Sequence, residues 1–461
     1  MGLLILAGRR VYEMPGGSAA SDSVPVVPDQ DAATSPPAPR PALAARLDAS
    51  WPVLARVAAI GMTFVFSLVV GRALGTGSAG LVFTAVVVVT LLSTAGRLGV
   101  DLDAMKRAAR LHDVGGLTRE SLGWARLVRL CVLGALPLTV LAMLVIVLAG
   151  DRVADARAYL VFALAVPLQA LAVLAAAVLR GGGRHGVGAL VEVGLAQGLA
   201  AVGVVLLAVG GRANAASVAV VFVVAQGAVC ALALWLVRSV WGTGPGVPDP
   251  PTPASRSQLL SMMGSGLLFY VLTWSPLLVL AIMGSAHDTS LYGAAARFPT
   301  AVAIIPTVLV TAVLPGLIAS FAHDRAEDGN RSLARINRLA AVGAASVSLP
   351  LLVAAPWVMG LFGPGFEEGA GALRLLAIGQ LIAVLLGPTA LLPPVLGLEK
   401  QAQWLLLGGC AVSFGLGAVL VGPYGAEGAA TGWLVALTGY GVVMAWMLRR
   451  SAGVVSPLRL R

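Results

Sequence analysis

Apolar residues in this chain come in blocks of roughly 20 that hold few charges, and this pattern limits what the chain can fold into. A helix of about 20 residues crosses the hydrocarbon core of a bilayer. Because hydrocarbon offers backbone groups no water, each block must be a helix or a strand of a closed barrel. Barrel strands alternate apolar and polar residues over about 10 positions, and these blocks do not alternate. The pattern therefore predicts an all-α polytopic membrane protein.

The block boundaries predict about twelve transmembrane helices. Only 11% of the residues are charged, against about 25% in soluble domains, so a soluble domain of this size is excluded. The predicted spans are 51–74, 78–100, 127–149, 158–179, 187–209, 216–237, 259–284, 291–319, 339–361, 371–396, 404–421 and 427–448.

A proline-rich link divides the predicted spans into six plus six. It prevents a continuous helix because it contains Pro245, Pro248, Pro250, Pro251 and Pro253. We therefore predict a disordered cytoplasmic tail at 1–50, a six-helix lobe at 51–238 and a cytoplasmic linker at 239–258. A second six-helix lobe at 259–448 and a cytoplasmic tail at 449–461 follow.

The positions of arginine and lysine indicate the orientation. With a cytoplasmic N-terminus, 23 of the 31 lie in inside segments and 3 in outside loops, and positive charge favours the cytoplasmic side. Both termini are therefore predicted to be cytoplasmic. The chain carries a net charge of +10, and its basic residues lie almost entirely between the apolar blocks. This placement indicates anionic lipid headgroups rather than nucleic acid as partners.

The two halves show a faint internal similarity. Ser78 and Thr289 open spans that follow tight outer turns, and Asn214 and Glu427 open the last span of each half. Six helices per half would relate the two bundles by a pseudo-two-fold axis along the membrane normal, which is a transporter architecture.

Charged residues inside the predicted spans are the best pointers to function, because burying a charge in a membrane is costly. They are Arg56, Arg72, Arg97, Glu192, Arg297 and Arg374. Those near span ends can reach the interface along their own side chains, and Arg97 can pair structurally with Asp101 four residues on. Arg297 lies about two turns inside its helix, before Pro299, Pro306 and Pro315. Prolines at such positions free backbone groups and line cavities, so Arg297 is a candidate contact for an anionic substrate.

The residues indicate no catalytic site, no metal and no cofactor. The chain has no Gly-rich phosphate loop ending in Gly-Lys-Ser/Thr, its four histidines are isolated in loops, and its outer loops are only a few residues long. Cys131, Cys230 and Cys410 lie inside apolar blocks, where we expect small buried hydrophobic side chains. The sequence therefore predicts a protein that is not an enzyme.

Three stretches carry a resemblance to a known family. They are Gly71–Gly75 with Ser78–Leu81, Leu291–Arg297 through Leu314 and Pro315, and Leu361–Phe366 with Leu396, Gly397 and Gly422–Ala430. In order and spacing they resemble the polysaccharide flippases of the multidrug/oligosaccharidyl-lipid/polysaccharide exporter superfamily, whose fold is MATE-like. The likeness covers nearly all of 51–450.

The resemblance implies an alternating-access transporter that moves undecaprenyl-diphosphate-linked oligosaccharide to the outer leaflet of a bacterial plasma membrane. Cationic residues in a central cavity would hold the diphosphate and acidic sugars, while the lipid tail stays in the bilayer. That role would fall to Arg297 first, then to Arg72, Arg97 and Arg56, since arginine stays charged and binds phosphate well. Expected partners are the lipid-linked oligosaccharide, membrane lipids and, as candidates, a polysaccharide polymerase and glycosyltransferases.

Two other functions stay open at this point. A cation-coupled drug or metabolite exporter of the same fold would need a cavity carboxylate, and Glu192 is the candidate for ion coupling, with structural pairing as its other interpretation. A non-transporting scaffold of a polysaccharide assembly complex would need no cavity. A cavity rich in arginine would favour the flippase. A neutral cavity centred on Glu192 would favour the cation-coupled exporter.

Overall fold

The computed structural model of the chain describes residues 42–150, 155–243, 251–302, 326–387, 393 and 398–452. Most of both predicted tails, part of the proline-rich link and the far ends of the predicted eighth and tenth spans lie outside these residues. Pro306, Pro315 and the Leu396–Gly397 part of the resemblance also lie outside.

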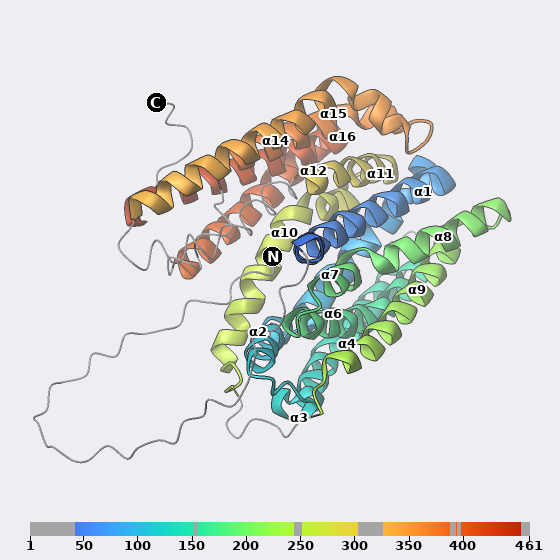
Figure 1. Ribbon diagram of the computed structural model, residues 1–461. Coiled ribbons are helices and arrows are strands. Elements are labelled where there is room, and N and C mark those ends of the chain that lie inside the picture. Colours follow the sequence, from blue (N-terminus) through green and yellow to red (C-terminus); the bar gives the residue numbers. More distant parts are fainter. Residues whose placement is uncertain are drawn as a thin grey trace, which may run out of the picture.

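The described chain is helical from end to end (Figure 1). Its first half holds α1 (Ala42–Gly96), α2 (Val100–Asp113), α3 (Arg119–Leu122), α4 (Trp124–Ala149), α5 (Ala156–Ala163), α6 (Ala165–Gly181), α7 (His185–Val193), α8 (Leu195–Val209), α9 (Ala215–Leu236) and η2 (Val237–Val240). Its second half holds α10 (Arg256–Met283), α11 (Ala286–Ala295), α12 (Arg297–Val302), α14 (Ala326–Gly360), η3 (Phe366–Gly369), α15 (Ala370–Leu385) and α16 (Glu399–Ala452).

Eight of the described helices are long and apolar enough to cross a membrane, or nine if the bent pair α7 and α8 counts as one span. Two of the eight, Trp51–Gly96 and Glu399–Arg450, have 46 and 52 residues, and about 20 residues suffice for one crossing. Each of these two has room for two crossings, as the sequence predicts.

The predicted boundary between the first two spans is a break at Gly75, where φ is +66°. Glycine adopts this left-handed conformation without the clash of a Cβ. Phe64, before the break, contacts Phe298. Phe83, after the break, contacts the neighbouring residue Arg297. The two parts of α1 therefore both lie against α12. Gly425, with φ of +48°, breaks α16 between the predicted spans 404–421 and 427–448 in the same way.

The structure has helix outside the predicted spans in two places. The first residues of α1, 42–50, are helical although we expected a disordered tail, and their Ala and Leu content favours a helix. The segment between the predicted spans 78–100 and 127–149 contains the amphipathic helix α2, whose apolar face packs against α6. Burial lowers the pKa of the Lys106 ammonium on this helix, and the nearby Asp103 carboxylate opposes that shift.

The two halves of the chain contact each other at the end that the charge pattern predicts to face outward. The Gly80 amide of α1 donates a 2.6 Å hydrogen bond to the Ser290 hydroxyl of α11. Arg72 donates to the Leu361 carbonyl over 2.8 Å. In Figure 1, α4, α6, α8 and α9 gather on one side and α14–α16 on the other, with α1 and α10 between them.

Aromatic rings fill the contact between the halves. Phe64 of α1, Phe298 of α12 and Phe362 after α14 meet edge to face, with centroids 5.2–6.1 Å apart. Phe362 belongs to a buried apolar cluster that also contains Phe83 and Tyr292, and Phe64 and Phe298 pack against this cluster. The cluster joins the halves and packs beside Arg297.

Candidate functional site

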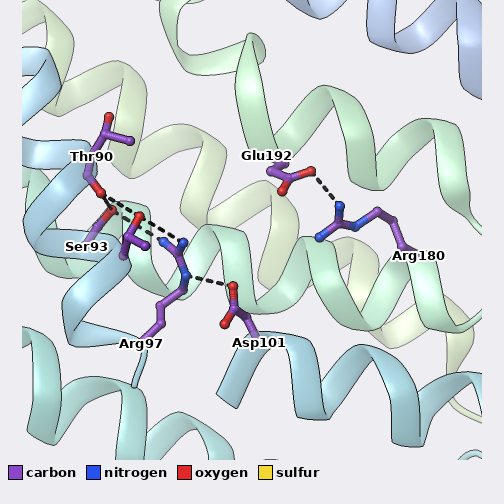
Figure 2. Close-up of polar contacts among 7 residues, drawn as sticks. Thr90, Ser93, Arg97, Asp101, Arg180 and Glu192 are labelled. Atoms are coloured by element: carbon purple, nitrogen blue, oxygen red, sulfur yellow. Dashed lines mark hydrogen bonds and ion pairs between the residues drawn. The ribbon is translucent and has the colours of Figure 1, made fainter. Parts of the chain in front are cut away.

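Arg97 is the centre of a buried polar network in the first half of the chain. It follows the last residue of α1, at a break where Leu98 and Gly99 both have positive φ. Its Nε donates to the Asp101 carboxylate over 3.0 Å, and its other nitrogens donate to the hydroxyls of Ser93 and Thr94. Figure 2 shows Arg97 lying beside Ser93 and reaching the Asp101 carboxylate. The predicted pairing of Arg97 with Asp101 is therefore present.

Glu192 lies between two arginines from different helices. Its Oε2 is 2.6 Å from Nη1 of Arg180 on α6 and 3.4 Å from Nη1 of Arg56 on α1. All three side chains are at least two-thirds buried. Glu192 lies just before the 48° bend between α7 and α8, where Gly194 lets Ala59 of α1 approach. The close packing at the bend holds the carboxylate against both cations, and Figure 2 shows its pairing with Arg180.

Helix α10 of the second half borders the Arg97 network. Gly99, two residues after Arg97, packs against the backbone of Leu259 and Met263 on α10. The Arg97 network therefore lies at the boundary between the two halves. Together the Arg97–Asp101 pair and the two pairs of Glu192 hold three arginines and two carboxylates, which leaves one net positive charge.

Arg297 lies elsewhere, against aromatic rings of both halves. Its guanidinium carbon is 5.3 Å from the centre of the Phe83 ring on α1 and 5.3 Å from that of Trp274 on α10. Only 7% of the residue is exposed. Its Nε and Nη2 are buried without a hydrogen-bond partner among the described residues. Cation–π contacts of this kind stabilise a cation by about 0.5–2 kcal/mol each, less than the cost of burying an unpaired charge.

The remaining in-span arginines are exposed and bonded to backbone carbonyls. Arg72 binds the Leu361 carbonyl across the boundary between the halves, and Arg374 binds the Leu352 carbonyl within the second half. Of the four arginines predicted to bind substrate, Arg97 pairs with Asp101 and Arg56 pairs with Glu192. Arg297 lies against aromatic rings instead, and Arg72 lies at the outer contact.

Sequence reasoning missed three residues of these sites. Arg180 falls at the end of a predicted span, where it counts among the inside segments, although it forms the shortest of these ion pairs. Phe83 and Trp274 carry no charge and resemble ordinary apolar span residues, so no sequence signal marks them.

The arrangement is suited to holding an anion. Guanidinium groups bind carboxylate and phosphate oxygens bidentately and stay charged at any physiological pH. Within the described residues, no three His, Cys, Asp or Glu side chains group closely enough to hold a metal ion. Cys131, Cys230 and Cys410 are buried and free, as expected.

The fold has clear counterparts among solved structures. A multidrug resistance MATE family transporter of the MOP superfamily, in an inward-facing conformation, aligns with a TM-score of 0.62 over 88% of this chain and 100% of its own, at 15% identity. An outward-facing conformation of a MATE family transporter gives 0.58 over 87% and 96%, at 15% identity. A MOP superfamily transporter from Pyrococcus furiosus, described as having a binding pocket of reversed polarity, gives 0.55 over 87% and 96%, at 14% identity.

These alignments define the class: an all-helical, multi-pass membrane protein with a MATE-like fold. The model of the polysaccharide biosynthesis protein family matches residues 47–320, more than half of the chain, and the chain belongs to this family. No curated protein matches the chain. The family resemblance and the fold class predicted from the sequence are confirmed.

Proposed function

We propose that this protein is a transporter that flips undecaprenyl-diphosphate-linked oligosaccharide across a bacterial plasma membrane by alternating access, for cell-surface polysaccharide biosynthesis. The proposal places both termini in the cytoplasm and divides the chain into two six-helix lobes, 51–238 and 259–448. A polysaccharide polymerase and glycosyltransferases would be its functional partners. Membership of the polysaccharide biosynthesis family supports the choice of cargo.

The observation that carries the proposal is the charge of the described membrane interior. Each carboxylate of the buried network is paired with arginine, and one positive charge is left over. Arg297 adds a further cation, whose Nε and Nη2 have no hydrogen-bond partner among the described residues. A diphosphate and acidic sugars are the complementary cargo, and a membrane interior of this charge would repel a cationic drug.

The alternative, a cation-coupled exporter, depends on Glu192. That carboxylate already lies against two guanidinium groups, at 2.6 and 3.4 Å. A proton or sodium ion that bound it would have to displace an arginine. Structural pairing is therefore the interpretation of Glu192 that the geometry favours.

Deleting the gene tests the function. We expect surface polysaccharide to disappear and lipid-linked oligosaccharide to accumulate, and Arg297→Ala to do the same with normal protein levels in the membrane. Unchanged polysaccharide after deletion would exclude the flippase. Changed drug resistance alone would favour the exporter. Loss on deletion but full export by Arg297→Ala and by Arg97→Gln would favour the scaffold.

A further inference from the structure

Asp103 is a buried carboxylate on α2 that bonds the chain beyond the proline-rich link. Only 6% of Asp103 and 7% of Arg107 are exposed. Oδ2 of Asp103 lies 3.6 Å from Nη1 of Arg107 on the next turn of α2. Oδ1 accepts a 3.1 Å hydrogen bond from the Ala254 amide, just before α10. A hydrogen bond to a charged acceptor is roughly twice as strong as a neutral one, so Asp103 holds the start of the second half against a helix of the first.

The link is bonded to the first half at its other end as well. The Gly242 amide donates a 2.8 Å hydrogen bond to the Leu117 carbonyl, in the segment between α2 and α3. Only residues 243–253 lie between the two bonded amides. Both ends of the link are therefore bonded to α2 and the segment that follows it. We call these two hydrogen bonds, Asp103–Ala254 and Leu117–Gly242, the linker clasp.

Helix α10 packs closely against the first half beside the linker clasp. A Cβ at Gly99 would lie 2.5 Å from the carbonyl oxygen of Leu259 and 3.2 Å from the backbone nitrogen of Met263. Gly99 also has a φ of +78°, which glycine adopts without strain. Because Gly99 puts no side chain between the two backbones, the start of α2 and the first turns of α10 form one tight joint between the halves.

The hydrogen bonds at the outward end lack this support from the chain. Gly80 and Ser290, which are 210 residues apart, share a bond between a neutral amide and a hydroxyl. The two ends are joined in the same conformation, so a movement of the halves has to break one contact and turn about the other. Breaking the linker clasp would take a bond from the buried Asp103 carboxylate, which is costly. The short link also keeps the two sides of the linker clasp close together, so that they rebind readily.

We propose that the linker clasp and the Gly99–Leu259 contact are the pivot about which the two halves turn. The pivot stays joined while the contact at the outward end opens and closes. The inference rests on the proposed function for the movement itself, which is alternating access. Asp103 is then a positioning residue, because it acts by holding α10 through the link. The halves tilt about one edge at the end predicted to be cytoplasmic.

The test compares two distances in the full-length protein in lipid nanodiscs. One pair of spin labels, at Gly77→Cys and Glu368→Cys, spans the outward contact, and a second pair, at Arg110→Cys and Arg256→Cys, spans the pivot. All four positions are exposed. The native cysteines are buried, and protein without added cysteines gives the background labelling.

Gly80→Ala is used to open the outward end, because a Cβ there would lie 2.7 Å from the backbone nitrogen of Ser290. We expect it to increase the population of long distances between the outward labels. The distance between the labels at the pivot should stay single and unchanged. A gate at the cytoplasmic end would instead change its distance when the outward end opens.

Three variants assign the joint to the linker clasp. Ala254→Pro removes the donor and should raise the ratio of open to joined clasp at least about tenfold, the effect of losing one hydrogen bond to a charged group. Ala254→Ser keeps the N–H and should behave like the unaltered protein. Asp103→Asn should lie between the two, because a neutral amide oxygen still accepts the bond but holds it more weakly.

The proposal is overturned if the pivot distance changes together with the outward distance in the Gly80→Ala protein. A constant outward distance would also overturn it, because a pivot requires halves that move, and so would equal behaviour of Ala254→Pro and Ala254→Ser. Ala254→Pro leaves the Asp103–Arg107 pair intact, so it decides the question even if Asp103→Asn fails to fold. Both readouts are distances and need no cargo. The proposed function fails separately, when deletion of the gene leaves surface polysaccharide intact.

Discussion

Arg180 donates a 2.6 Å hydrogen bond to Glu192, and this contact joins α6 to α7 inside the membrane region. The same carboxylate also accepts from Arg56 of α1. One acidic side chain therefore holds three helices of the first half together and neutralises part of their positive charge.

Replacing Glu192 with Gln should destabilise the protein, because two guanidinium groups lose their counter-charge. Breaking a fully buried ion pair costs about 3–5 kcal/mol, and partial exposure here reduces the expected loss to about 1–3 kcal/mol. Thermal unfolding of the purified protein measures it. The double variant with Arg180→Gln and Glu192→Gln should lose less free energy of unfolding than the two single variants lose in sum.

Glu368→Gln is the control for this experiment, since Glu368 forms an exposed pair with His287 and surface pairs contribute little. Equal effects of Glu192→Gln and Glu368→Gln on unfolding would show that the buried network does not support the fold. A Glu192→Gln protein that was fully stable but had lost cation-dependent transport would instead support the interpretation as a cation-coupled exporter.

Arg97→Gln and Arg72→Gln should differ in polysaccharide export. Arg97 lies in the buried network, so its loss should reduce export at least about tenfold, the effect of losing one strong charged contact. Arg72 is exposed and bonded to a backbone carbonyl, so its loss should leave at least about half of the export. Export is assayed by surface polysaccharide at matched protein levels, and the reverse order of effects would reassign the binding role to Arg72.

Gly80→Ala should weaken the contact between the halves. A Cβ at Gly80 would lie 2.7 Å from the backbone nitrogen of Ser290, closer than packed atoms allow. We expect faster labelling of a cysteine placed at Ser290 or Thr289 from the outside. Gly77→Ala is the matched control, because a Cβ there meets nothing within 4 Å. Identical labelling of the two variants would contradict the role of this contact.

Gly194→Ala should destabilise the bend between α7 and α8. Its Cβ would lie 2.5 Å from the Cα of Ala59, and overpacking of this kind costs about 1–3 kcal/mol. Gly61→Ala, in the open on α1, should instead stabilise by about 0.5–1 kcal/mol, because it removes backbone freedom from the unfolded chain. Thermal unfolding distinguishes the two outcomes. An unchanged stability of the Gly194→Ala protein would show that the bend can relax.

Much of the fold could be predicted from the sequence because each span is specified locally. A block of about 20 apolar residues has to be helical in a membrane, and Gly75 and Gly425 break the long helices where tight turns were expected. The pairing of Arg97 with Asp101 was predictable for the same reason, since the two residues lie four positions apart.

Other contacts were decided by the tertiary structure. Arg180 and Arg56 approach Glu192 only because α1, α6 and α7 pack together, and an arginine side chain is long enough to reach a partner on a neighbouring helix. The sequence by itself determined a multi-pass helical membrane protein with a few arginines in its spans. Only the tertiary structure decided which of those arginines gained a carboxylate and which one, Arg297, was left between two aromatic rings. Charge compensation depends on distances of a few ångströms between helices far apart in the chain, and no local pattern encodes them.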